Sequence, residues 1–199
     1  FIVMNHTGGA SVPGSAAVSV DDVLALGCDI IGHANGGTTS LPDEELHRVF
    51  EAPGAIQLVQ AGNLRSSLRM LEIARERDDL HRVLVATDSP TGTGVMPLGM
   101  IKTVAEFSSL AGFSATDALA FATGNPGRVL RRPEGLVEIG RPADFVLLQP
   151  PAGGVATNAL SAIERGDIPG ICGVVIDGEV HALRSRNTPA PARLAAQRA

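Results

Sequence analysis

Three residues of the types that bind metal ions follow short apolar runs in this sequence. His6 stands in NHTGG, His33 in GHANGG and Asp88 in TDSP, and each precedes a loop that contains glycine or proline. Two imidazoles and a carboxylate are ligands that suit Zn²⁺ or Fe(II). If the apolar runs are parallel strands, their carboxyl ends meet at one edge. The spacing therefore predicts a metal site at that edge.

Each of these residues also has a structural interpretation. A single histidine at a strand end is commonly a hydrogen-bonded core residue, and an aspartate before Ser-Pro is commonly a turn or cap residue. Recurrence in register on successive units favours a site. The remaining histidines lie on a polar helix face, before a strand and after a hairpin strand, and we assign them to surface or structural positions: His47, His81 and His181.

Asp88 raises an electrostatic question. The apolar run over residues 83–86 predicts a core strand, so the carboxylate that follows it is expected to be buried. Burying an unpaired carboxylate costs several kcal/mol. A neighbouring metal ion would stabilise the ionised form, so the sequence predicts that Asp88 pairs with a cation.

The elements that must position these residues repeat four times: a short apolar run, a polar or glycine-rich loop, and a helix-type segment. Strands that alternate with helices indicate a parallel sheet with right-handed crossovers, and near-continuous apolar strands indicate a sheet covered on both faces. Four such units are half of an eight-unit barrel. We therefore expect an α/β fold in which residues 1–132 form half of a (β/α)8 TIM-type barrel and a following helix.

Several helix boundaries are marked by capping residues. Ser19 and Asp22 form a capping-box pattern, and Ser40 is expected to cap a helix in SLPDEELHRVF. Another helix is expected to begin at Ser114 and to end near residues 124–126, where Gly-Asn-Pro is a stop signal.

The pattern changes after about residue 133. Residues 133–184 are expected to form a small β module, with a hairpin around the turn Asp177-Gly178. Residues 185–199 are basic and contain proline, which predicts an extended tail.

Composition limits the classes of partner. The chain has 199 residues and a net charge of −5, with no basic cluster before the tail, which argues against nucleic acid and anionic membranes. No apolar run reaches the roughly 18 residues of a membrane span. Cys28 and Cys172 lie far apart and match no metal motif, so we interpret them as reduced thiols of a cytoplasmic protein.

Several motifs together resemble a known family: HTGG, GHANGG, ATDSPTGTG, ATGNPGRVL, GLVEIGRPADFVLL and GVVIDGEV. They are similar to the carboxyl-terminal half of metal-dependent hydrolases of the amidohydrolase superfamily, over nearly the whole chain. Within it, the sequence most resembles members that open a cyclic enamide, a six-membered oxo-nicotinate lactam, and release ammonia. The resemblance implies barrel units five to eight and part of a small β-sandwich whose other strands come from the amino terminus.

The resemblance also implies roles for the three candidate ligands. His6 would be the metal ligand that ends strand five and His33 the one that ends strand six. Asp88 would end strand eight, bind a second metal ion and take the proton from the bridging water. The implied cofactor is a divalent metal, Zn and/or Fe(II), binuclear in the full-length protein.

The family's other ligands, a His-x-His pair on strand one and a Lys or Glu on strand four, do not occur in this sequence, which we expect to begin at strand five. The expected partner of this chain is therefore the missing amino-terminal half of the barrel, and we expect the fragment alone to be inactive. The half-barrel would expose sheet edges, so we also expect a homo-oligomer.

The expected activity is hydrolysis of the carbon–nitrogen bond of a small cyclic amide. Candidate contacts to a substrate carbonyl or carboxylate are Thr7, Asn35, Gln60, Asn63 and Thr91. The alternative for each of these residues is a structural role in a turn. Two other functions remain open: hydrolysis of another cyclic amide or imide by an enzyme of the same superfamily, and a non-catalytic binding or scaffold half-barrel.

Overall fold

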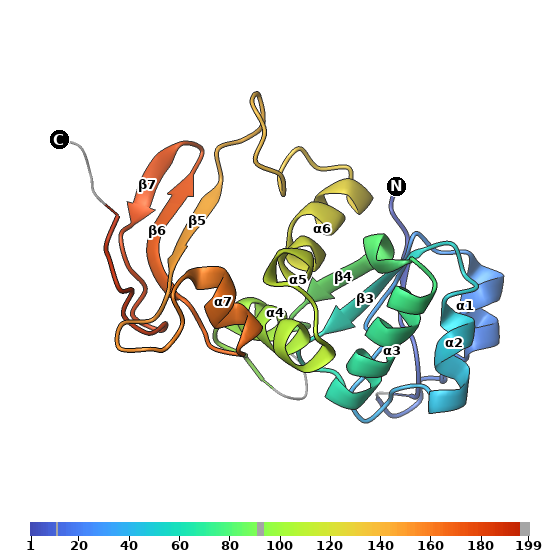
Figure 1. Ribbon diagram of the computed structural model, residues 1–199. Coiled ribbons are helices and arrows are strands. Elements are labelled where there is room, and N and C mark those ends of the chain that lie inside the picture. The colour runs from blue at the N-terminus through green and yellow to red at the C-terminus, as the bar shows by residue number, and fades with distance from the viewer. Residues whose placement is uncertain (11, 91–93, 196–199) are drawn as a thin grey trace. The chain divides into compact units, whose positions relative to one another are not determined.

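The structure is a computed structural model that describes residues 1–10, 12–90 and 94–195 (Figure 1). Two compact units contain the chain: residues 1–103 with 128–131, and residues 104–127 with 132–199. The domain division expected from the sequence, with boundaries after residues 132 and 184, stays a prediction. No helix in the described ranges is long and apolar enough to cross a membrane.

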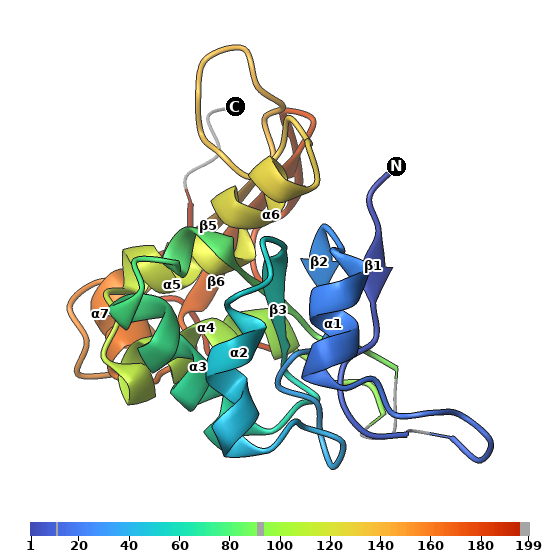
Figure 2. The same cartoon turned by 90° about the vertical axis from the view of Figure 1, so that its right-hand side faces the viewer.

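The first unit contains a four-stranded parallel sheet in the order β1-β2-β3-β4. Its elements are β1 (Met4–Asn5), α1 (Val20–Leu26), β2 (Ile30–Ile31), the 3₁₀ helix η1 (Asp43–Glu45), α2 (Leu46–Val49), β3 (Ala55–Val59), α3 (Leu64–Glu76), the 3₁₀ helix η2 (Leu80–Arg82) and β4 (Val83–Ala86). Helices α1, α2 and α3 lie along one side of the strands (Figure 2). The predicted parallel βα arrangement is confirmed in this unit.

Most aliphatic side chains of β2, β3 and β4 are buried on both faces of the sheet, as the near-continuous apolar strands predict, whereas Met4 of β1 is exposed. One cluster joins Ile30, Ala55 and Leu84 across β2, β3 and β4, with Val129 packed against it. The buried residues of α3 include Met70, Leu71, Ile73 and Ala74. Each fully buried aliphatic side chain of this size contributes roughly 1.5–3 kcal/mol, so the sheet is held in place mainly by hydrophobic burial.

The predicted start of α1 is confirmed, whereas that of the next helix is wrong. Ser19 and Asp22 form the full capping box. Ser40 does not cap a helix, because the chain first forms η1, with Pro42 as its N-cap, and α2 begins only at Leu46. A residue before proline is biased away from the helical region, so Leu41 cannot continue a helix started at Ser40.

The buried side-chain amide of Asn35 holds the loop after β2 in place. Asn35 is fully buried, and its Nδ2 donates to the Val59 carbonyl (2.9 Å) and to Ser67 Oγ (2.8 Å). Its Oδ1 accepts from the Val59 N–H at 2.8 Å. Gly62 leaves the space for this amide, since a Cβ there would lie 2.1 Å from Asn35 Nδ2. The loop after β2 is thus tied to β3 and to the first turn of α3.

The second unit contains a three-stranded antiparallel sheet in the order β5-β6-β7. Its elements are α5 (Ala115–Ala122), β5 (Phe145–Gln149), α7 (Ala159–Glu164), β6 (Gly170–Ile176) and β7 (Glu179–Ala182), while α4 (Gly99–Ala111) and α6 (Gly124–Val129) have residues in both units. A buried cluster around Ala118 and Ile163 includes Leu148 of β5 at its margin. The predicted hairpin is confirmed, because Asp177 and Gly178 have φ of 50° and 80°, as a type I′ turn requires.

The predicted helix at Ser114 is confirmed, but the stop signal after it is only half right. Ser114 caps α5, which ends at Ala122. The Gly-Asn-Pro stretch does end α5, yet it also opens α6 at Gly124. Proline is tolerated in the first turn of a helix, where its missing N–H costs no intrahelical hydrogen bond, so Pro126 permits this second start.

We predict that Asn35→Ala lowers the free energy of unfolding by about 2–4 kcal/mol, because buried partners in β3 and α3 lose their hydrogen bonds. Urea denaturation of the protein measures the loss. Asn63→Ala is the matched control: Asn63 Oδ1 caps α3 by accepting from the Ser66 N–H, and losing a cap costs about 1 kcal/mol. Equal losses of unfolding free energy in the two variants would contradict the conclusion that Asn35 ties the loop after β2 to β3 and α3.

Candidate metal centre

The three predicted ligands follow the carboxyl ends of three strands in the first unit. His6 directly follows β1, His33 comes two residues after β2, and Asp88 comes two residues after β4. Because the strands are parallel and adjacent ones pair, these ends lie at the same edge of the sheet.

His6 and His33 contact each other. His6 Nδ1 lies 2.9 Å from His33 Nε2, and the two ring centroids are 4.5 Å apart at an interplanar angle of 61°. His6 Nε2 lies 3.1 Å from the Gly9 carbonyl oxygen, which only accepts hydrogen bonds. His6 therefore carries its proton on Nε2, and its Nδ1 lone pair accepts the Nε2–H of a neutral His33. One proton thus lies between the two imidazoles.

Asp88 is exposed, so the expectation that it is buried is wrong. Strand β4 ends at Ala86, and the chain turns at Asp88, whose φ is 56°. The left-handed turn takes the carboxylate out of the strand into solvent. Burial therefore does not explain why an aspartate stands here, although its charge still acts on the imidazole of His33.

Burial lowers the pKa of His33 below its ordinary value, and the neighbouring His6 lowers it further, while the Asp88 carboxylate acts in the opposite direction. Two imidazolium rings side by side would repel each other, and half-burial of His33 removes part of the water that would stabilise its charge. The neutral state that the hydrogen bond requires is thus the state that the surroundings favour.

The candidate substrate contacts occupy different environments. Thr7 is buried, and Thr103 Oγ1 donates to the side-chain oxygen of Gln60. The amides of Asn35 and Asn63 bond to the chain itself, at β3 and at the start of α3. Thr91 lies outside the described residues.

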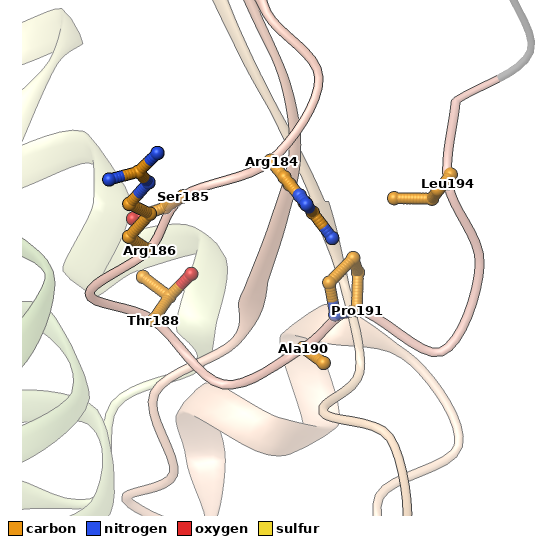
Figure 3. Close-up of a pocket in the computed structure, with 7 residues that line it drawn as sticks. All are labelled: Arg184, Ser185, Arg186, Thr188, Ala190, Pro191 and Leu194. Carbon is orange, nitrogen blue, oxygen red and sulfur yellow. The ribbon is translucent and has the colours of Figure 1, made fainter.

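The other three histidines are exposed. His47 bonds to Arg69, His81 Nδ1 bonds to the Asp78 carbonyl, and His181 lies on β7. A pocket of about 450 Å³ in the second unit has no His, Cys, Asp or Glu in its lining, which consists of Arg184, Ser185, Arg186, Thr188, Ala190, Pro191 and Leu194 (Figure 3). Neither feature competes with the edge of the parallel sheet as the candidate site.

Comparison with known proteins identifies the family. The sequence model of the amidohydrolase family matches residues 28–180. The chain belongs to the amidohydrolase family.

Among its relatives, enamidase from Eubacterium barkeri is 40% identical over 198 residues, which are 99% of this chain and 51% of enamidase. The crystal structure of enamidase superposes with a TM-score of 0.93 at 39% identity and covers 98% of this chain and 51% of the other. A β-aspartyl dipeptidase from Fervidobacterium islandicum shares the fold, with a TM-score of 0.61 at 16% identity over 99% of this chain and 48% of its own. The chain thus spans about half the length of these relatives, and the predicted fold, the carboxyl-terminal half of a TIM-type barrel, is confirmed.

Amidohydrolases are in general metal-dependent, and the histidine pair fits part of such a site. Two nitrogens bound to one tetrahedral Zn²⁺ lie about 3.3 Å apart, given Zn–N bonds of roughly 2.0–2.1 Å. The observed 2.9 Å needs only a small opening. Within the described ranges, however, no three His, Cys, Asp or Glu side chains gather closely enough to hold a metal ion. Among the described residues the pair alone would therefore supply two nitrogen ligands but not a complete metal site.

Two amide side chains that the motifs did not indicate also reach these loops. Asn5 donates to the His6 carbonyl, and Gln57 accepts from the His33 N–H. A polar residue inside an otherwise apolar strand, as in AIQLV, is the sequence signal that would have found Gln57.

We predict that the metal-free protein loses stability as the pH falls below about 6.5, the ordinary pKa of histidine. Because the folded pKa of His33 is lowered, the unfolded chain binds more protons in this window, and stability rises with pH. Urea denaturation between pH 5 and 8 measures the slope. His33→Asn, which tolerates the positive φ, should flatten it, whereas the same change at exposed His47 should not. An unchanged slope in His33→Asn would count against this origin.

Proposed function

We propose that the whole protein hydrolyses the carbon–nitrogen bond of a small cyclic amide with the help of a divalent metal ion, as an enamidase-like enzyme. The observation that carries this proposal is the contact between His6 Nδ1 and His33 Nε2 at the carboxyl edge of the parallel sheet. The likeness to enamidase, over nearly all of this chain, supports the substrate class.

In this proposal His6 Nδ1 and His33 Nε2 would hold the metal, Zn²⁺ or Fe(II), and Asp88 would hold a second ion. Bound metal lowers the pKa of water and polarises the substrate carbonyl. The remaining ligands come from the half of the protein that this chain does not span, and so does the rest of the barrel. The site is then binuclear only when both halves are present.

His6 keeps its Nδ1 free for this role, because the Gly9 carbonyl holds the proton on Nε2. A neutral His33 could bind metal through Nε2 only with its proton on Nδ1, so the proton that lies between the rings would have to move to that nitrogen. The lowered pKa of His33 favours the neutral ring over the imidazolium, which has no lone pair for a metal. Metal binding would therefore replace the hydrogen bond between the two imidazoles.

Asp88 moves the proton of hydrolysis. Its carboxylate accepts a proton from the attacking water and gives it to the leaving ring nitrogen, which becomes an amine as the carbon–nitrogen bond breaks. When the substrate is an enamide, ring opening frees an enamine, and a second water molecule then hydrolyses this enamine with release of ammonia. Exposure at the strand end leaves the carboxylate accessible to substrate.

The residues proposed from the sequence as substrate contacts differ in their position relative to the strand ends. Thr7 and Gln60 stand next to the strand ends, where a hydroxyl or an amide would orient a ring carbonyl or carboxylate. Asn63 is exposed at the start of α3, and Thr91 follows β4 in the chain. Asn35 supports the loop that carries His33.

We predict that His6→Ala and His33→Ala each lower the metal content of the purified full-length protein by at least one ion per chain, because each removes a nitrogen ligand. Metal analysis after dialysis measures the loss, and His81→Ala, at an exposed histidine, is the control. Full metal content in both site variants would contradict the assignment of this pair.

We predict that Asp88→Asn lowers kcat of the full-length enzyme on a six-membered cyclic enamide by about 10²- to 10⁴-fold, the contribution of a proton-transfer group. Ammonia release measures turnover. Asp78→Asn is the matched control, since Asp78 is also exposed and has a φ of 60°.

Turnover of cyclic imides instead of enamides would assign the protein a different substrate specificity within the amidohydrolase family. Metal binding without turnover of any cyclic amide would favour a binding role and contradict the proposal.

A further inference from the structure

Two amide side chains hold the backbone of the histidine pair. Asn5, the last residue of β1, donates from Nδ2 to the His6 carbonyl at 2.7 Å and to Thr7 Oγ1 at 3.3 Å. Gln57, in the middle of β3, accepts at Oε1 from the His33 N–H at 3.2 Å. Both amides come from paired strands of the parallel sheet, and each contacts the backbone of a residue that carries an imidazole.

The backbone at His33 needs such support. Its φ of 33° lies in the left-handed region that non-glycine residues rarely adopt. Such a conformation persists only where surrounding contacts determine it. Gln57 supplies two of them, because its main-chain carbonyl also accepts from the Ala34 N–H at 2.9 Å. The Gly36 N–H closes the turn on the His33 carbonyl at 2.7 Å.

Asn5 holds its position at a cost. Its Oδ1 is buried and accepts no hydrogen bond from any described residue. Buried acceptors without a partner are uncommon. The amide nevertheless faces its donor end toward the His6 carbonyl, so the contact with the loop sets its orientation.

We propose that Asn5 and Gln57 are positioning residues that fix the backbones of His6 and His33, so that the two facing ring nitrogens stay within reach of one metal ion. This inference rests on the proposed function. It assigns opposite tasks to the two amides, since Asn5 acts through a donor and Gln57 through an acceptor.

These tasks give opposite responses to an amide-to-carboxylate change. Gln57→Glu keeps an acceptor for the His33 N–H, whereas Gln57→Met removes it. Asn5→Asp removes the donor and places a carboxylate against the His6 carbonyl. We expect Gln57→Met and Asn5→Asp to weaken Zn²⁺ binding by about 10- to 100-fold, the usual effect of losing a group that orients a ligand. Gln57→Glu should bind within about threefold of the unchanged protein.

The experiment titrates the full-length protein with Zn²⁺ in competition with a chromophoric chelator. Gln149→Met is the matched control, because Gln149 is also a half-buried strand glutamine but lies on β5 of the other unit. A second readout uses the metal-free protein: nitrogen-15 spectra of the imidazoles report the Nε2–H form of His6 and the hydrogen bond to His33. Both signals should change in Gln57→Met and Asn5→Asp and persist in Gln57→Glu.

The outcomes separate this inference from the proposed function. If the unchanged protein binds no Zn²⁺, the proposed metal chemistry fails, and the imidazole spectra alone decide the positioning role. If it binds Zn²⁺ and Gln57→Met and Asn5→Asp bind equally tightly, the positioning role is overturned. A loss in Gln57→Glu as large as in Gln57→Met would also overturn it, because the acceptor would then be irrelevant.

Discussion

The parallel pairing of β1 to β4 is the constraint on which the position of every candidate ligand depends. The pairs Asn5–Ile31 and Ile31–Ile56 fix where β1, β2 and β3 stop relative to one another. A shift of one residue would turn every side chain to the opposite face. Strand pairing holds β1 against β2, and hydrophobic burial holds β2, β3 and β4, so residues outside the candidate site help to determine whether His6 and His33 touch.

The contact between His6 and His33 limits how much positive charge the two rings can carry at this edge of the sheet. Two imidazoles at hydrogen-bond distance share one proton well, but they accommodate a second proton poorly. A divalent cation would occupy the same region with two nitrogen lone pairs directed at it. The adjacency of the rings was predictable from parallel strands alone. Which nitrogen carries the proton was not, because it depends on the Gly9 carbonyl and therefore on the path of a glycine-rich loop.

Features set by near neighbours in the chain were predictable, and features set by distant ones were not. The cap at Ser19 and the turn at residues 177–178 depend on contacts within about four positions, and both occur as expected. Helix α6 depends on tertiary packing: Gly127 fits against the backbone of Glu134, where a Cβ would meet the carbonyl oxygen at 2.3 Å. The exposure of Asp88 likewise depends on how the chain leaves β4. Apolar periodicity carries no information on either.

The fit of Gly62 around the Asn35 amide restricts how this protein can acquire a new specificity. Any side chain at position 62 would expel the amide and release the loop after β2. Substitutions that change specificity in the loop after β3 would therefore have to fall at positions other than 62, because a side chain there would cost the hydrogen bonds of the Asn35 amide.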